Sequence, residues 1–258
     1  MASLRANSNS TKSFKAPAPA IPAWKRMIDL GFCCCALPIL ALATFFIAVL
    51  MSIASPGPIF FRQERVGYMG RRFHLYKFRT MHVGADTSNH AAYFTGLMNS
   101  NAPMQKLDAR GDSRLIPFGW MLRASGMDEL PQILNVFKGD MSVIGPRPCI
   151  PYEYENYSLP QRTRFHARPG LTGLWQVSGK NRTTFDRMIQ LDIQYAVEKS
   201  LKLDLKILLL TVPAVLSQVH DMCRVRWRRA ERQPDALPTT GECKTVDIEK
   251  DAPGARVS

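Results

Sequence analysis

The stretch Leu30–Ile53, LGFCCCALPILALATFFIAVLMSI, decides how this chain is organised. It holds no charged side chain, and its conspicuously polar residues are Thr44 and Ser52. As a helix rising about 1.5 Å per residue it reaches about 36 Å, enough to cross a hydrocarbon core of about 30 Å. This length, and the Ser55-Pro56-Gly57-Pro58 turn that follows without a small-residue cleavage pattern, argue against a cleaved signal peptide. The sequence therefore predicts one membrane helix.

Basic residues flank this helix on both sides. They are Lys12, Lys15, Lys25 and Arg26 before it and Arg62, Arg65, Arg71, Arg72, Lys77 and Arg79 after it. Because basic clusters prefer the cytoplasmic side, a simple span would export one of them. Pro38 removes a backbone hydrogen bond and is expected to kink the helix. A bent, re-entrant helix and an ordinary proline-containing span both remain open from the residues alone. Asp29, at the mouth, is expected to pair with Lys25 or Arg26 one turn earlier.

Composition sets the remaining limits. The 258 residues, 46% hydrophobic, are enough for one folded domain, here expected over 56–218 behind a membrane helix over 24–55. The polar ends 1–23 and 219–258 are predicted to be basic and largely disordered. The net charge of +13 favours polyanions such as nucleic acid, anionic lipid or substrate phosphates. The six cysteines show no metal-ligand spacing, which favours a reduced, cytoplasm-facing protein.

The segment Ile59–Met81 is predicted to form a strand, a turn and a second strand. On the second strand, period-two alternation places Lys77 and Arg79 on one face, a geometry suited to a diphosphate, although a solvated basic edge strand has the same pattern. Residues 82–113 are expected to form an inserted loop to which no chemistry is assigned. Near the other end of the domain, Asp204–Leu216 has an apolar stripe that suits either a membrane interface or core packing.

Two adjacent carboxylates, Asp128 and Glu129, follow a predicted helix around 116–124. Ser125 has the spacing of a capping box, and Pro131 favours a first helical turn, so both carboxylates are expected at a helix N-terminus. Neighbouring helical side chains diverge by about 100°, so one carboxylate can face a phosphorus atom while the other faces a metal. Ordinary capping gives the same pattern.

Two glycine- and proline-rich segments follow these carboxylates. Gly145-Pro146-Arg147-Pro148 restricts the backbone so that Arg147 is presented in few orientations, with an oxyanion as the expected target. The segment Arg168–Arg182 alternates turn-forming glycines with a short strand and ends in a basic-amide cluster.

In this order the segments resemble the bacterial sugar transferases, also called monotopic phosphoglycosyl transferases. The resemblance extends from Trp24 to about Leu216. Its motifs are Lys25-Arg26-x-x-Asp29, Ser55-Pro56-Gly57-Pro58-Ile59-Phe60, Arg62-Gln63-x-Arg65-Val66-Gly67, Tyr76-Lys77-Phe78-Arg79-Thr80-Met81, Asp128-Glu129-Leu130-Pro131-Gln132, Gly145-Pro146-Arg147-Pro148 and Arg168-Pro169-Gly170-Leu171-Thr172-Gly173.

The resemblance implies an α+β, mostly helical fold with a single re-entrant membrane helix, a small mixed α/β catalytic domain and interfacial amphipathic helices. It places the enzyme at the bacterial cytoplasmic membrane, with the catalytic domain on the cytoplasmic face. The implied reaction moves a sugar 1-phosphate from a UDP-sugar to polyprenyl (undecaprenyl) phosphate, releases UMP and begins the synthesis of an exopolysaccharide or a related glycan.

The resemblance also assigns roles to residues. Asp128 would form a covalent phosphosugar intermediate. Glu129 would ligate Mg²⁺, supported by Asp204. The substrate-binding set is Lys77, Arg79, Arg123, Arg147, Arg168, Gln176 and Lys180. Similar proteins often have Ser at Gly126 and Arg at Lys180, and a lysine there lacks the planar fork that grips phosphate.

The implied partners are the UDP-sugar, polyprenyl phosphate, membrane lipids, downstream glycosyltransferases and, as a possibility, a second copy of the chain. No nucleic acid is expected, since no single-strand platform or recognition helix is evident. Two other functions fit parts of the sequence. One is a non-catalytic basic membrane tether, and the other is a membrane-bound UDP-sugar pyrophosphatase in which water replaces the lipid acceptor.

Overall fold

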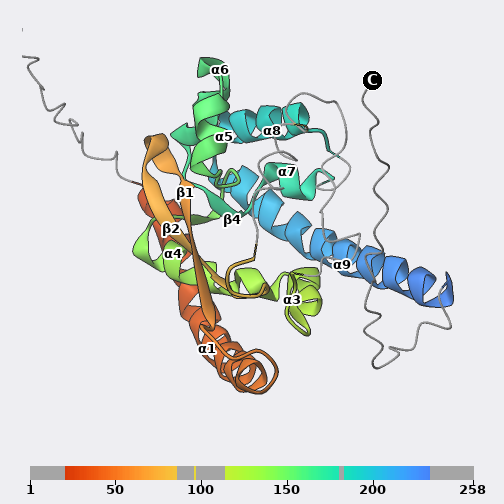
Figure 1. Cartoon of the computed structure of the whole chain (residues 1–258). Helices are drawn as coiled ribbons and strands as arrows, with labels where there is room; N and C mark the ends of the chain where they lie inside the picture. The colour runs from red at the N-terminus through yellow and green to blue at the C-terminus, as the bar shows by residue number, and fades with distance from the viewer. Residues whose placement is uncertain (1–20, 86–95, 97–113, 180–182, 233–258) are drawn as a thin grey trace, which may run out of the picture. The chain divides into compact units, whose positions relative to one another are not determined.

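The computed structural model describes residues 21–85, 96, 114–179 and 183–232 (Figure 1). The chain divides into two compact units, 1–219 and 220–258. The elements within the described residues are α1 (Ala23–Ala54), β1 (Phe60–Val66), the 3₁₀ turn η1 (Tyr68–Gly70), β2 (Arg72–Phe78), α3 (Gly119–Ser125), η3 (Met127–Gln132), α4 (Ile133–Lys138), β3 (Ser142–Ile144), α5 (Pro151–Asn156), α6 (Leu159–Arg162), η4 (Thr163–His166), β4 (Gly170–Thr172), α7 (Leu174–Val177), α8 (Phe185–Glu198) and α9 (Leu201–Arg232). The predicted mixture of many helices with a few strands is confirmed.

Within the described residues, α1 is the one helix that is long and apolar enough to cross a membrane. One side of it packs on the domain core through Cys33, Leu40, Ile47 and Met51. These positions recur every four or seven residues and so lie on one helical stripe. Large apolar side chains elsewhere on α1 stay exposed, among them Ile39, Leu42, Phe45, Phe46 and Ile53. The helix is continuous through Pro38, and the predicted kink remains a prediction.

The predicted hairpin over Ile59–Met81 is confirmed. Strands β1 and β2 pair antiparallel, from Phe60 opposite Phe78 to Val66 opposite Arg72. The η1 turn between them includes Met69 and Gly70, both with positive φ (51° and 73°), which reverses the chain within a few residues. Leu75 and Phe78 of β2 are buried and pack in the same core cluster as α1.

Strands β3 and β4 form a separate two-stranded parallel sheet that joins two motifs of the sequence. The Gly145 N–H donates to the Thr172 carbonyl (2.9 Å), and the Gly170 N–H donates to the Pro146 carbonyl (2.9 Å). The backbones are so close that a Cβ on Gly145 would lie 2.0 Å from the carbonyl oxygen of Arg168. The glycines of both motifs therefore serve this close backbone contact.

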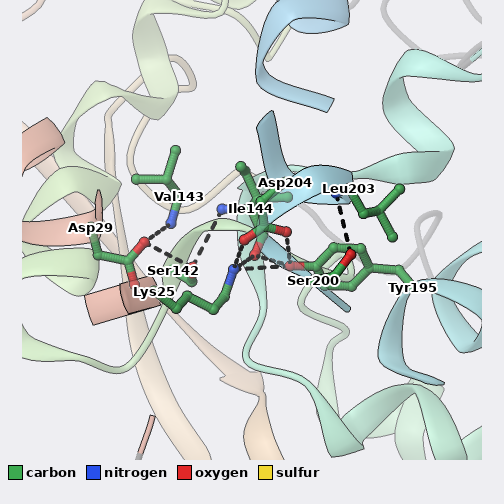
Figure 2. Close-up of polar contacts among 9 residues, drawn as sticks. All are labelled: Lys25, Asp29, Ser142, Val143, Ile144, Tyr195, Ser200, Leu203 and Asp204. Atoms are coloured by element: carbon green, nitrogen blue, oxygen red, sulfur yellow. Dashed lines mark hydrogen bonds and ion pairs between the residues drawn. The ribbon is translucent and has the colours of Figure 1, made fainter. Parts of the chain in front are cut away.

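The N-terminal end of α1 is held to the domain by a buried polar network (Figure 2). The Lys25 ammonium donates to Asp204 Oδ2 (2.6 Å), the Tyr195 hydroxyl (2.9 Å) and the Ile144 carbonyl (3.0 Å). Lys25 and Asp204 are both almost fully buried. A buried ion pair with its remaining hydrogen bonds satisfied fixes two elements firmly, because either charge alone would be poorly solvated.

Asp29 has a different partner from the one predicted. Its Oδ1 accepts hydrogen bonds from the Ser142 hydroxyl (2.8 Å) and the Val143 N–H (2.9 Å). Lys25 instead donates to Asp204, and the Arg26 guanidinium donates to the carbonyls of Val136 (2.8 Å) and Phe137 (2.7 Å) at the end of α4. The predicted pairing of Asp29 with Lys25 or Arg26 was therefore wrong. These side chains instead bond to β3, α9 and α4, because buried polar groups take the hydrogen-bond partners that tertiary packing brings to them.

The C-terminal part of the domain also departs from expectation. Helix α9 continues to Arg232, so it extends into the tail 219–258 that was predicted to be basic and largely disordered. In its first part Ile207 is buried, while Leu205, Leu209, Val212 and Leu216 are exposed. Most of the apolar stripe predicted from Asp204 onward therefore does not pack in the core. The predictions of disorder at 1–23 and 233–258 and of a loop at 82–113 fall mostly outside the described residues.

Candidate active site

The two adjacent carboxylates lie in the short 3₁₀ turn η3. This turn connects α3 and α4, which are labelled in Figure 1. Gly126, in the left-handed region (φ 74°), ends α3 and begins η3. The Ser125 hydroxyl accepts a hydrogen bond from the Met127 N–H (3.4 Å) but caps neither helix. The predicted capping box is therefore not formed. A glycine takes the positive φ at no steric cost, and it replaces the serine as the residue that starts the turn.

The geometry of η3 separates the two carboxylates. Asp128 is buried, with 7% of its surface exposed, whereas the side chain of Glu129 is 45% exposed. Lys77, at the end of β2, donates from Nζ to Glu129 Oε1 at 2.9 Å. One carboxylate is thus held inside the domain, while the other faces a cation and solvent, as expected of neighbouring residues in a tight turn.

Asn135 of α4 fixes this turn against β2. Its Oδ1 accepts a hydrogen bond from the Tyr76 N–H (3.1 Å), and its Nδ2 donates to the His74 carbonyl (2.7 Å). Asn135 is fully buried, so both bonds are shielded from water. Because Tyr76 precedes Lys77, this bridge sets the distance between the basic side chain and the carboxylates.

Arg65 belongs to the same region, although no role was predicted for it. It is 8% exposed, and its Nη2 donates to Gln63 Oε1 (2.6 Å). Burial and the neighbouring Arg147 cation lower its pKa to about 10, partly offset by Glu153 and Glu129. A buried guanidinium beside a like charge is a place where an anion would be strongly favoured. The Arg62-Gln63-x-Arg65 motif was the available signal, but mid-strand alternation does not reveal which arginine turns inward.

Hydrogen bonds to its backbone hold Arg147 in place. Its N–H donates to Asp192 Oδ2 (3.3 Å), and its carbonyl accepts a hydrogen bond from Arg164 Nη2 (2.9 Å). Arg164 and Asp192 form a buried ion pair. The Arg147 side chain stays 32% exposed, with Nη1 3.7 Å from Glu153 Oε1. The turn is rigid and the guanidinium remains accessible, which suits recognition of an oxyanion.

Arg79 is placed differently from the prediction. It lies just beyond the last residue of β2, is 5% exposed, and donates to the Pro58 carbonyl (2.7 Å), the Ser55 carbonyl (2.5 Å) and the Ser55 hydroxyl (3.2 Å). The strand ends at Phe78, so period-two alternation no longer sets the direction of Arg79. Its guanidinium holds the C-terminal end of α1 and is not presented beside Lys77.

The other predicted substrate ligands that the structure describes lie in different segments of the chain. Arg123 is part-buried in the last turn of α3, shortly before the carboxylates. Arg168 lies over the Tyr68 ring at 5.7 Å, and burial together with Arg26 lowers its pKa. Gln176 donates from Nε2 to the Leu171 carbonyl (3.1 Å). Lys180 lies outside the described residues. Lys77 pairs with Glu129, and the charge of Arg65 interacts with both Glu129 and Arg147.

A magnesium ion fits Asp128 and Glu129 but not Asp204. The described residues contain no cluster of three or more metal-ligating side chains, yet Mg²⁺ commonly takes one or two carboxylates and completes its shell with water and substrate phosphates. Asp204 is 1% exposed, and its two oxygens accept from Lys25 (2.6 Å) and the Tyr195 hydroxyl (2.7 Å). Both oxygens of this buried carboxylate are engaged and its charge is already balanced by Lys25, so Asp204 joins α9 to α1.

Sequence comparison gives consistent matches to this chain. A family model described as bacterial sugar transferase matches residues 21–218. The galactosyl transferase CpsE of Streptococcus agalactiae is 45% identical over 161 residues, 62% of this chain and 35% of that protein. The exopolysaccharide production protein ExoY of Sinorhizobium fredii is 38% identical over 188 residues, 69% of this chain and 80% of that protein. The UDP-glucose:undecaprenyl-phosphate glucose-1-phosphate transferase of Caulobacter vibrioides is 38% identical over 209 residues, 78% of this chain and 73% of that protein.

Proposed function

We propose that this chain, which belongs to the bacterial sugar transferase family, transfers a sugar 1-phosphate from a UDP-sugar to undecaprenyl phosphate and releases UMP. The name of the Caulobacter relative states a reaction of this class for that protein. The observation that carries the proposal here is the Asp128–Glu129 turn, held against Lys77 of β2 and next to Arg65. Carboxylates with adjacent cations are the groups needed to hold and attack a diphosphate.

In the first proposed step a carboxylate oxygen of Asp128 attacks the phosphorus that carries the sugar. A new P–O bond forms to Asp128, and the bond to the bridging oxygen breaks, so that UMP leaves with the electron pair. Arg65, Arg147 and Lys77 would hold the phosphate oxygens and stabilise the charge that develops on them. Burial of Asp128 limits access of water to the aspartyl phosphate.

In the second proposed step an oxygen of undecaprenyl phosphate attacks the same phosphorus. The Asp128 carboxylate is released, and the product is a sugar linked to the lipid through a diphosphate. A Mg²⁺ ion held by Glu129 and the substrate phosphates would neutralise charge on the diphosphate. Lys77 orients Glu129 for this role through their 2.9 Å ion pair.

The acceptor is a lipid, and α1 supplies a membrane anchor for the domain. At its N-terminal end Arg26 bonds to α4, and at its C-terminal end Ser55 bonds to Arg79. Asn135 links α4 to β2, the strand that leads into Arg79. A spanning helix would place its ends on opposite sides of a core about 30 Å thick. Attachment of both ends to one folded unit supports a re-entrant helix, and the basic residues that flank α1 on both sides favour the cytoplasmic face for the domain.

The test uses the full chain in detergent or nanodiscs with Mg²⁺, undecaprenyl phosphate and a panel of UDP-sugars, with UMP release as the signal. We expect release over many turnovers to require the lipid and to disappear in Asp128→Asn, whereas the wild type without lipid should release at most one UMP per enzyme as the adduct on Asp128 forms. Asp186→Asn, the same change at an exposed site on α8, is the matched control. Undiminished turnover in Asp128→Asn would exclude Asp128 as the nucleophile. Continued UMP release without the lipid, beyond one UMP per enzyme, would indicate a pyrophosphatase, and no turnover with any sugar would favour a tether.

A further inference from the structure

Glu153, in the first turn of α5, is a buried carboxylate that the proposed reaction does not use. Its surface is 0% exposed, and neither of its oxygens accepts a hydrogen bond from a residue that the structure describes. Its partner is Arg147, whose Nη1 lies 3.7 Å from Oε1, an ion pair without a hydrogen bond. Buried carboxylates are normally hydrogen-bonded, so the position of Glu153 requires an explanation.

The explanation lies in the cations around Glu153. Its charge acts on both Arg65 and Arg164 as well as pairing with Arg147. Arg164 already has Asp192 as a bonded counter-ion, which leaves Arg65 and Arg147 to share Glu153. Glu129 also offsets part of the Arg65 charge, but its side chain is 45% exposed and paired with Lys77, so within the described residues Glu153 is the fully buried carboxylate whose charge acts on both Arg65 and Arg147.

The two arginines cannot separate to relieve their repulsion. The Val66 N–H, next to Arg65, donates to the Cys149 carbonyl at 2.8 Å, and Arg65 Nη1 lies 3.4 Å from the Pro148 carbonyl. These bonds tie β1 to the segment that carries Arg147. Buried Arg65 therefore depends mainly on Glu153 for compensation, with a smaller contribution from Glu129, whereas Arg147 is partly exposed and can also meet an anion from solution.

We propose that Glu153 is an internal counter-ion that holds Arg65 and Arg147 together before substrate binds and then competes with a substrate phosphate for Arg147. The inference rests on the proposed function in placing these arginines in the substrate site. Glu153 is a positioning residue, since it acts through Arg147. Because it has the same sign as phosphate, it stabilises the empty site and weakens the binding of phosphate ligands, so that UMP leaves readily after transfer.

The test is Glu153→Gln, which keeps the shape and removes the charge, with binding of UMP and of a short-chain prenyl phosphate measured separately by calorimetry. We expect at least one ligand to bind tighter, on the order of tenfold, by removal of a nearby like charge. The ligand-free protein should melt at a lower temperature. Glu153→Asp, which keeps the charge, should have a ligand affinity and a melting temperature closer to those of the wild type. Glu155→Gln, on the same helix but with its side chain 67% exposed, should change neither.

Weaker or unchanged binding of both ligands in Glu153→Gln would overturn the proposal, because a residue with only a packing role would lower stability without tightening binding. The ligand that gains affinity identifies which substrate brings its phosphate to Arg147. If Glu153→Gln does not fold, the double variant Arg65→Met/Glu153→Gln should fold, since it removes one charge of each sign, and failure of the double variant would also refute the idea. Binding is measured without turnover, so a lack of transferase activity would not affect this result. Failure of the wild type to bind either ligand would refute the proposed function itself.

Discussion

The buried pair between Lys25 and Asp204 allows a direct test of how α1 is attached to the domain. We expect Lys25→Met to be strongly destabilising, because it leaves the Asp204 carboxylate buried with the Tyr195 hydroxyl as its one remaining hydrogen-bond donor among the side chains that the structure describes. Lys25 and Asp204 side chains are 7% and 2% exposed, so water cannot replace the lost cation. Breaking a pair of this kind by removing one partner typically lowers the free energy of unfolding by about 3–5 kcal/mol. For a domain of this size that corresponds to a fall in melting temperature of roughly 6–20 °C.

The assay is thermal unfolding in nanodiscs, followed by intrinsic fluorescence. Arg72→Met is the matched control, because Arg72 forms ion pairs with Glu64 and Glu155 while its side chain is 58% exposed. Such exposed pairs contribute about 0–1 kcal/mol. The double variant Lys25→Met/Asp204→Leu should recover most of the loss, since a buried pair can be replaced by apolar side chains at little cost. A Lys25→Met variant as stable as the Arg72→Met control would refute the reasoning.

Four further outcomes follow from the same contacts. Lys77→Met should lower kcat/KM for the UDP-sugar by about 10–100-fold, through loss of a charge-assisted bond to Glu129, without a large change in melting temperature. Arg79→Met should instead lower the melting temperature by several degrees and leave the KM of the remaining folded enzyme near wild type. A rise in KM without a fall in melting temperature would show that Arg79 is a phosphate ligand after all. Gly145→Ala should unfold or severely destabilise the domain in a denaturation assay, because its new Cβ would meet the Arg168 carbonyl oxygen at 2.0 Å. Chelation by EDTA should stop UMP release and Mg²⁺ should restore it, whereas full activity in EDTA would remove the metal from the mechanism.

Local patterns predicted the elements that depend on local chemistry. The apolar run before Ile53 predicted α1, and the glycines near Tyr68 predicted the turn between β1 and β2. The segment around Asp128 and Glu129 predicted a helix N-terminus with two diverging carboxylates, and the structure places both in the first turn of the 3₁₀ helix η3, which Gly126 and not Ser125 begins. These features depend on side-chain periodicity or turn residues within a few positions of one another.

The partners of buried charges could not be predicted in the same way. Lys25 finds Asp204 at a separation of 179 residues, and Arg79 finds the end of α1 where alternation placed it beside Lys77. Arg65 is a motif residue, but its burial against Arg147 depends on how β1 meets the segment after β3. Such contacts are set by tertiary packing, and a single sequence carries no periodicity that reveals them.

The central claim is most directly tested by mass spectrometry of the enzyme after rapid mixing with a UDP-sugar and Mg²⁺ in the absence of lipid acceptor. The account predicts a mass increase equal to one phosphosugar, located on the peptide that contains Asp128 and removed by adding undecaprenyl phosphate. Formation of the lipid product by an enzyme that never carries this adduct would contradict it.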